Sequence, residues 1–197
     1  RKFSANVICD KNNLLVDGKK ITLIKHEEIY DIKWNNFDVD VVIECSGKFK
    51  SRKELQSHID VGAKKVILSS PPLDDSIKTI VLGVNDEILN NEDLIISNAS
   101  CTTNSAAPLI KIIDENWEIE SVYITTVHSF TNDQNLHDSP HKDLRRARSA
   151  TSSIIPTSSG AAKALTKIFP KLEDKIGGCG IRVPVPNASL TDLTCVV

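Results

Sequence analysis

A strand–helix–strand pattern between residues 39 and 68 constrains the fold of this chain more than any other feature. The apolar run Val39–Glu44 predicts a mostly buried strand. Ser51 and Glu54 then form the capping box that begins a helix, and Gly62 ends that helix. Val66–Leu68 forms the next strand. Two strands joined through a helix lie parallel with a right-handed crossover, so the sequence predicts an α/β fold.

Shorter signals on either side complete this first half of the chain. Asp17-Gly18 joins two apolar runs and predicts an antiparallel hairpin near the start. Two further strands are expected around Thr79–Val84 and Leu94–Ser97. Ligands of parallel sheets bind where the strands end, here at Ser46-Gly47 and Ser69-Ser70.

Composition excludes several classes of protein. With 40% hydrophobic and 25% charged residues, the chain lies in the ordinary globular range, so disorder is a poor interpretation. A net charge of −2 gives no electrostatic reason to expect nucleic acid or an anionic membrane as the main partner. Five scattered cysteines without a CxxC pair favour a reducing compartment over structural zinc or a disulfide framework, and no metal site is expected.

The pattern changes near residue 100. A helix over 102–116 and a strand over 122–128 are expected, followed by a long polar stretch, 129–153. Loops of that length inside compact domains are usually functional or disordered. A short helix over 160–169 and strands at 181–183 and 190–197 complete this half.

Cys101 stands at the junction between a strand and a helix. A helix N-terminus favours the thiolate and supplies N–H groups for an oxyanion, which suits a nucleophile. A buried structural cysteine beside a capping serine fits the same local pattern. His128 ends a strand and suits a general base, although a lone histidine there is more often an ordinary structural residue.

Two polar segments offer anion sites. The cluster Arg145-Arg146-Ala147-Arg148 is either a solvated charge run or a phosphate clamp. Thr157-Ser158-Ser159-Gly160 precedes a helix and is either an ordinary cap or an anion site at the helix N-terminus.

Taken together, these segments resemble the phosphorylating, bacterial-type glyceraldehyde-3-phosphate dehydrogenase family, in that family's order. The octet Ser97–Asn104 is the most specific of them. The other matching segments are Glu44–Phe49, Leu82–Asn85, Thr125–His128, Asp143–Arg148, Ile154–Ala164 and Arg182–Asn187. The resemblance implies a Rossmann-like NAD-binding portion over 1–100, followed by part of an α+β catalytic domain with a mixed sheet over 101–197.

The resemblance also implies a reaction. Cys101 attacks the aldehyde of glyceraldehyde 3-phosphate while His128 takes the proton, and inorganic phosphate cleaves the resulting thioester to give 1,3-bisphosphoglycerate. Residues matching the family's substrate and phosphate pockets are Ser100, Thr102, Thr131, Arg146, Ser159, Gly160 and Arg182. Residues matching its cofactor contacts are Ser46, Gly47, Phe49 and Ser69. The resemblance further implies a cytoplasmic homotetramer.

Departures from the family pattern qualify this picture. No Gly-x-Gly-x-x-Gly turn is present, and the family's final helix has no counterpart, so we expect an internal piece that binds NAD poorly alone. Ser139-Pro140 lies where the family discriminates between cofactors; it favours NAD and leaves NADP open.

Three rival functions remain open. Erythrose-4-phosphate dehydrogenase shares the cysteine and the histidine. A non-catalytic binding protein on the same scaffold has no need of the thiol, the base and both anion pockets. A Cys–His hydrolase lacks an orienting partner for the histidine and ranks last.

Overall fold

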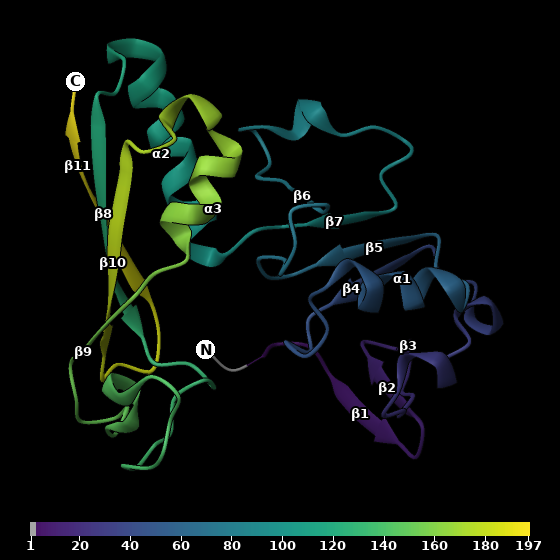
Figure 1. Ribbon diagram of the computed structural model, residues 1–197. Coiled ribbons are helices and arrows are strands. Elements are labelled where there is room, and N and C mark those ends of the chain that lie inside the picture. The colour runs from purple at the N-terminus through teal and green to yellow at the C-terminus, as the bar shows by residue number, and fades with distance from the viewer. Residues whose placement is uncertain (1–2) are drawn as a thin grey trace.

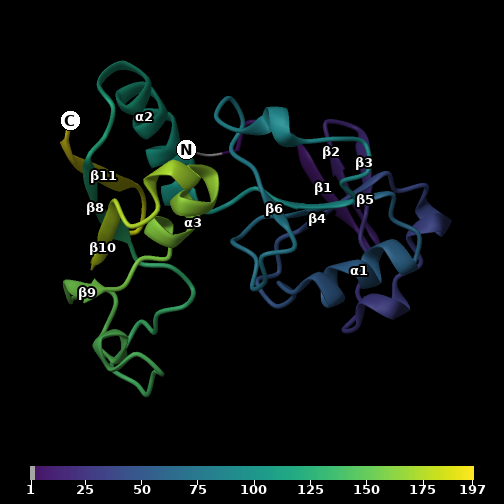
Figure 2. The same ribbon diagram turned by 45° about the horizontal axis from the view of Figure 1, so that its top comes forward.

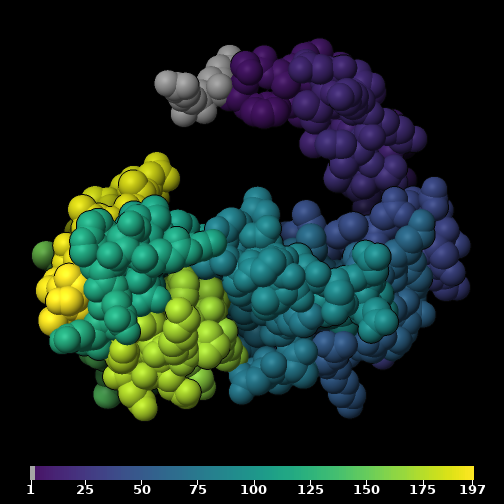
Figure 3. Space-filling model, turned by 90° about the horizontal axis from the view of Figure 1, so that it is seen from above, coloured from purple at the N-terminus to yellow at the C-terminus, as the bar shows by residue number. Residues whose placement is uncertain are grey.

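The computed structural model describes residues 3–197, which form three sheets (Figure 1). The first is an antiparallel ribbon of β1 (Val7–Asp10), β2 (Asn13–Val16) and β3 (Lys19–Thr22). The predicted hairpin is confirmed, because Asp17 and Gly18 both adopt positive φ between β2 and β3, as a two-residue turn requires. In the space-filling view the ribbon is an arm, with a hollow between it and the rest of the chain (Figure 3).

The second sheet is parallel, with strand order β4-β5-β7-β6. Its strands are β4 (Val41–Glu44), β5 (Lys65–Leu68), β6 (Lys78–Thr79) and β7 (Ile95–Ser97). The helix α1 (Arg52–Asp60) connects β4 to β5 with the complete capping box of Ser51 and Glu54, and Gly62 follows it in the left-handed region. The predicted strand–helix–strand unit is therefore confirmed.

Two expectations about this sheet are wrong in detail. The strand β4 is not mostly buried, because α1 covers only one of its faces; Val41 and Ile43 on the other face are 46% and 64% exposed. The strand expected over residues 79–84 ends at Thr79. Beyond it the chain turns, and the buried Asn85 side chain accepts from the Val81 N–H and donates to the Thr79 carbonyl.

The third sheet is mixed, with strand order β11-β8-β10-β9. Its strands are β8 (Ser121–Ser129), β9 (Ile155–Thr157), β10 (Ile176–Val183) and β11 (Ser189–Val196). The central pair, β8 and β10, runs parallel, whereas β9 and β11 are antiparallel to their neighbours. The glycine-rich start of β10 carried no strand signal, so the predicted strand at 181–183 was too short.

Two helices cover one face of the mixed sheet. The helices α2 (Cys101–Trp117) and α3 (Ala161–Ile168) lie on the side that faces the parallel sheet, in both views of the ribbon (Figures 1 and 2). Ile110 of α2, Ile124 of β8 and Leu165 of α3 belong to the same buried cluster. This packing fixes the first turn of α2 against β8, where the candidate chemistry lies.

Candidate active site

Cys101 occupies the first position of α2, and the preceding residues explain why the helix begins there. Ala99 adopts a left-handed conformation with φ 59° although it is not glycine, a strained backbone of the kind that collects at functional sites. Ser100 is the N-cap, and its side chain accepts from the Thr103 N–H at 3.0 Å. The N–H groups of Cys101 and Thr102 have no acceptor one turn earlier in the helix.

The structure brings Cys101 and His128 together. The Sγ atom of Cys101 lies 3.4 Å from Nε2 of His128, although the two residues belong to α2 and β8. The other ring nitrogen, Nδ1, lies 2.7 Å from the Ser129 carbonyl, which can only accept, and 3.2 Å from Arg182 Nη1, which can only donate. The shorter of the two contacts favours the tautomer that carries its hydrogen on Nδ1. In that tautomer Nε2 is free to accept a proton from the thiol.

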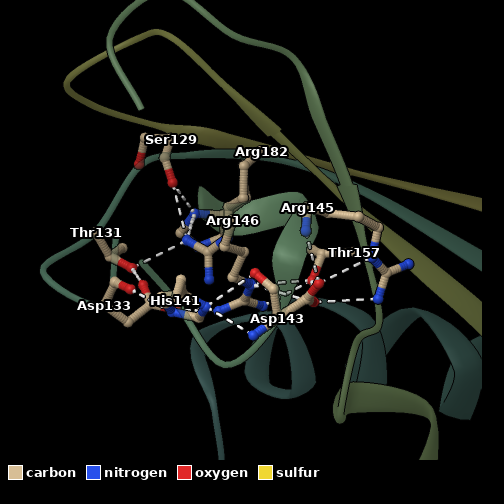
Figure 4. Close-up of polar contacts among 10 residues, drawn as sticks. Ser129, Thr131, Asp133, His141, Asp143, Arg145, Arg146, Thr157 and Arg182 are labelled. Carbon is tan, nitrogen blue, oxygen red and sulfur yellow. Dashed lines mark hydrogen bonds and ion pairs between the residues drawn. The ribbon is translucent and has the colours of Figure 1, made fainter. Parts of the chain in front are cut away.

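A pocket of about 200 Å³ opens beside this pair. Besides Cys101 and His128, its lining includes most of the residues that the sequence proposed for anion binding: Ser100, Thr102, Arg146, Ser159, Gly160 and Arg182. Thr131 does not line this pocket. It is linked to it through Arg182, whose Nη1 donates to Thr131 Oγ1 at 3.1 Å and to the Ser129 carbonyl at 3.0 Å (Figure 4).

The arginine cluster divides by environment. Arg146 points into the pocket, where Nε and Nη2 donate to Thr157 Oγ1 at 3.0 and 2.9 Å, and it forms an ion pair with Asp133 (Figure 4). Arg145 instead pairs with Asp143 and has a side chain that is 55% exposed. Arg148 pairs with Asp138 and is 69% exposed. Of the three, only Arg146 is placed to meet a ligand in this pocket.

Charge inside the site is unevenly balanced. Burial lowers the pKa of Arg182, and the nearby Arg146 lowers it further. Burial by itself would raise the pKa of Asp133, but a hydrogen bond from Thr131 and the charges of Arg146 and Arg182 lower it overall. Three guanidinium groups, those of Arg145, Arg146 and Arg182, thus share the two carboxylates of Asp133 and Asp143, which leaves one positive charge for an incoming anion.

Asp133 and Thr157 were missed as site residues by sequence reasoning. Thr157 belongs to a segment that the sequence marked as an anion site, so a signal was present. Asp133 had none, because it meets Arg146 only through the folding of the loop between β8 and β9. The segment before α3 has no ordinary serine cap, because the N-cap is Gly160. Ser159 Oγ accepts from the Ala161 N–H, and Ser159 also lines the pocket.

Two of the four proposed cofactor residues line a second, wider opening. Gly47 and Ser69 line it at the ends of β4 and β5, together with Cys45, Ser70, Thr131 and Asn132. Ser46 and Phe49 do not line it; Ser46 turns back to bond Glu44, and the Phe49 ring lies 4.9 Å from Lys48 Nζ. The opening therefore joins the ends of the parallel sheet to the loop that carries Thr131.

Two negative findings apply to residues 3–197. No cluster of three or more His, Cys, Asp or Glu side chains is arranged to hold a metal ion there. None of the helices in this range has the length and apolar character that crossing a membrane requires.

Fold and site together define a class. It is an α/β protein in which a parallel sheet, with an opening at the ends of its strands, adjoins a mixed sheet that carries a cysteine–histidine pair and an arginine. Two family models match. Residues 100–197 match the glyceraldehyde 3-phosphate dehydrogenase C-terminal domain, and residues 1–52 match the NAD binding domain of the same enzyme. The chain belongs to the glyceraldehyde-3-phosphate dehydrogenase family.

Curated relatives agree with that assignment. The chain is 48% identical over 193 residues to glyceraldehyde-3-phosphate dehydrogenase 2 of Bacillus subtilis, covering 98% of this chain and 56% of the relative. Identity to the Geobacillus stearothermophilus enzyme is 47% over 193 residues, covering 98% and 57%. The Mycobacterium tuberculosis H37Rv enzyme is 52% identical over 163 residues, covering 83% and 48%. The chain spans about half the length of these relatives.

Proposed function

We propose that the protein carrying this sequence oxidises and phosphorylates glyceraldehyde 3-phosphate to 1,3-bisphosphoglycerate with NAD, a step of glycolysis and gluconeogenesis. One observation carries the proposal: the 3.4 Å approach of Cys101 Sγ to His128 Nε2 beside a pocket that two arginines line. A thiol and a base alone fit many reactions. The arginines add the means to hold phosphate, which this reaction requires twice.

His128 begins the reaction by taking the thiol proton on Nε2. The sulfur attacks the aldehyde carbon, and the carbonyl oxygen becomes the hydroxyl of a hemithioacetal. While negative charge develops on that oxygen, the imidazolium and the free N–H groups at the start of α2 stabilise it. The same imidazole accepts the hydroxyl proton when the carbon is oxidised to the thioester.

The wider opening suits NAD. At Gly47 the backbone φ of +76° disfavours any residue with a side chain. No atom from another part of the chain lies within 4 Å of the position that a side chain would take, so a ligand can approach the backbone there. Ser70 Oγ, also at this opening, is a buried hydroxyl without a partner among the described residues. Gly47, Ser69 and the turn at Ser46 would hold the cofactor, with Phe49 nearby. A nicotinamide bound there would supply the hydride acceptor for oxidation of the carbon attached to sulfur.

Two anion pockets divide the remaining residues. Arg182 and Thr131, which are hydrogen-bonded to one another, hold the phosphate of the substrate. The attacking phosphate lies among Ser100, Thr102, Arg146, Ser159 and Gly160. Its oxygen attacks the thioester carbon, the carbon–sulfur bond breaks, and Cys101 leaves as the thiolate that His128 reprotonates. A thioester conserves the energy of oxidation that hydrolysis would release.

The proposal extends to organisation and location. A boundary near residue 100 separates a cofactor portion from a catalytic portion, and it falls where β7 leads into α2. Association as a homotetramer is supported by apolar side chains on the uncovered face of the mixed sheet, including Tyr123, Leu190 and Val196, which are 51%, 58% and 51% exposed. A reducing cytoplasm suits five free cysteines.

The test is turnover by the complete, purified protein that carries this sequence. Absorbance of NADH should rise only when glyceraldehyde 3-phosphate, NAD and phosphate are all present, and Cys101→Ser should abolish it. Iodoacetate should inactivate the enzyme, and the substrate should protect it. Faster turnover of erythrose 4-phosphate would assign the sister activity, and the absence of turnover with either aldehyde would leave a binding protein.

A further inference from the structure

A buried hydrogen-bonded chain of side chains lies outside the active site. We propose that Trp34, His58 and Glu44 form a relay that fixes the turn at Ser46-Gly47 in the shape that receives the cofactor. The three are positioning residues that act through the turn. This inference rests on the proposed function, because it assigns the turn to cofactor binding.

The relay begins at the indole of Trp34. Its Nε1–H donates to Nδ1 of His58 at 3.1 Å, and the two rings pack with centroids 5.9 Å apart. An indole N–H can only donate, so Nδ1 must be the bare nitrogen of the imidazole. The hydrogen of His58 is therefore on Nε2.

Glu44 receives that hydrogen. Nε2 of His58 lies 3.2 Å from Oε2 of Glu44, and the two residues are 3% and 6% exposed. The second oxygen, Oε1, accepts from both the N–H and the hydroxyl of Ser46, at 2.7 and 2.5 Å. One carboxylate thus joins α1, which carries His58, to the turn after β4.

The turn takes its shape from these bonds. Ser46 Oγ also accepts from the Lys48 N–H at 3.1 Å, so a single side chain fixes the backbone on both sides of Gly47. Gly47 lines the wider opening with φ +76°. Rotation of the Glu44 carboxylate would release two donors of Ser46 and with them the edge of that opening.

Buried polar side chains such as those of this relay contribute little to the stability of a core. Burying a carboxylate and an imidazole rarely stabilises a fold more than apolar packing of the same volume. What a satisfied polar network supplies is a single orientation. Here the orientation is transmitted to the turn after β4, which carries Gly47 at the proposed cofactor site.

The tautomer argument gives a sharp test. In Glu44→Gln, the amide that keeps an acceptor toward Ser46 presents an N–H₂ group to His58, where Nε2 already carries a hydrogen. The imidazole can adopt the other tautomer, with its hydrogen on Nδ1. That hydrogen would then face the indole N–H of Trp34, so two donors would point at each other. One donor stays unsatisfied in either form, until Trp34→Phe removes the indole donor.

The experiment uses the complete protein that carries this sequence and measures its Kd for NAD by calorimetry, together with KM for NAD, kcat and melting temperature. Glu44→Gln should weaken NAD binding about tenfold, the cost of one unsatisfied buried donor, with kcat at saturating NAD within about twofold. Adding Trp34→Phe should partly restore NAD affinity. Leu55→Ala is the matched control: Leu55 is fully buried on the same helix and touches none of the relay hydrogen bonds, so it should lower the melting temperature without changing Kd.

Nitrogen NMR of His58 supplies an independent readout, because the relay requires a hydrogen on Nε2 in the wild-type protein. Unchanged NAD affinity in a folded Glu44→Gln protein, or no rescue by Trp34→Phe, would overturn the relay. If Glu44→Gln does not fold, His58→Gln provides the same measurement, with the same expected loss of NAD affinity. If the complete wild-type protein fails to bind NAD, the proposed function itself is contradicted, which separates the two failures.

Discussion

His128 and Arg182 are direct partners on the parallel strands β8 and β10, with Arg182 Nη1 3.2 Å from His128 Nδ1. Cys101 approaches the opposite nitrogen of the same ring. The imidazole therefore lies between the Cys101 thiol and the Arg182 guanidinium that we propose holds the substrate phosphate. A substrate that reaches both must carry its anionic group only a few atoms from its carbonyl carbon, as a triose phosphate does.

The cysteine–histidine pair makes a prediction about thiol reactivity. His128→Asn removes the acceptor beside Cys101, so we expect the rate at which iodoacetamide alkylates Cys101 to fall about tenfold or more. Turnover should fall about a hundredfold or more, as for other lost general bases. Mass spectrometry of peptides after a short exposure measures the alkylation.

Cys45 provides the internal reference, since it is exposed and far along the chain from the pair. Its alkylation rate should not change. Burial raises the pKa of Cys195, which should make that thiol the slower control at neutral pH. Equal alkylation of Cys101 in both proteins would show that the histidine does not activate it.

The two neighbouring arginines should differ in their effect on phosphate. Arg146→Ala removes a guanidinium that lines the pocket, and we expect KM for inorganic phosphate to rise about tenfold to a hundredfold. Arg145→Ala removes the same charge from the exposed rim and should leave that KM within about twofold. A larger effect from Arg145 would reverse the assignment.

Close packing between β8 and β10 predicts an effect on stability. A methyl group at Gly178 would lie 2.9 Å from the carbonyl oxygen of Ile124, which cannot move without breaking the sheet. We expect Gly178→Ala to lower the free energy of unfolding by about 1–3 kcal/mol. Gly180→Ala should cost less, because its methyl group meets the Thr157 side chain at 3.3 Å. Urea denaturation of both variants measures which one loses more stability. Equal midpoints would contradict the expected difference.

The capping box of α1 predicts an acid-dependent loss of stability. The hydroxyl of Ser51 lowers the pKa of Glu54 below its ordinary value of 4.5, and the N–H groups of Ser51 and Lys50 lower it further. A carboxyl whose pKa is lower in the folded state stabilises the fold above the unfolded pKa. That stability is lost as the pH falls through the folded value.

Glu54→Gln should therefore unfold more easily than the wild-type protein at pH 7, and the difference should shrink as the pH falls below about 4.5. Ser51→Ala, which removes the cap itself, should cost about 1 kcal/mol at neutral pH. Chemical denaturation at both pH values tests this. A Glu54→Gln effect that stays the same in acid would mean that the carboxylate charge contributes nothing.

Local patterns predicted the elements correctly where the signal was contained in a few consecutive residues. The hairpin at Asp17-Gly18, the capping box at Ser51 and the start of α2 near Cys101 are examples. Each depends on bonds between residues a few positions apart. The first half of β10 was not predicted, because its signal does not lie in neighbouring residues. Glycine has no preference for strands, and this segment is a strand only because it pairs with β8.

The sequence by itself determined the family, the order of the strands and helices apart from β9, and the residue types that carry the chemistry. Only the tertiary structure decided that Arg146 rather than Arg145 enters the pocket, that Asp133 joins it there, and that β4 keeps one face exposed. The physical reason is the separation in sequence between the residues that interact. Capping and turn bonds are set by neighbours in the chain, whereas a guanidinium finds its partner only after strands distant in sequence have fixed their register.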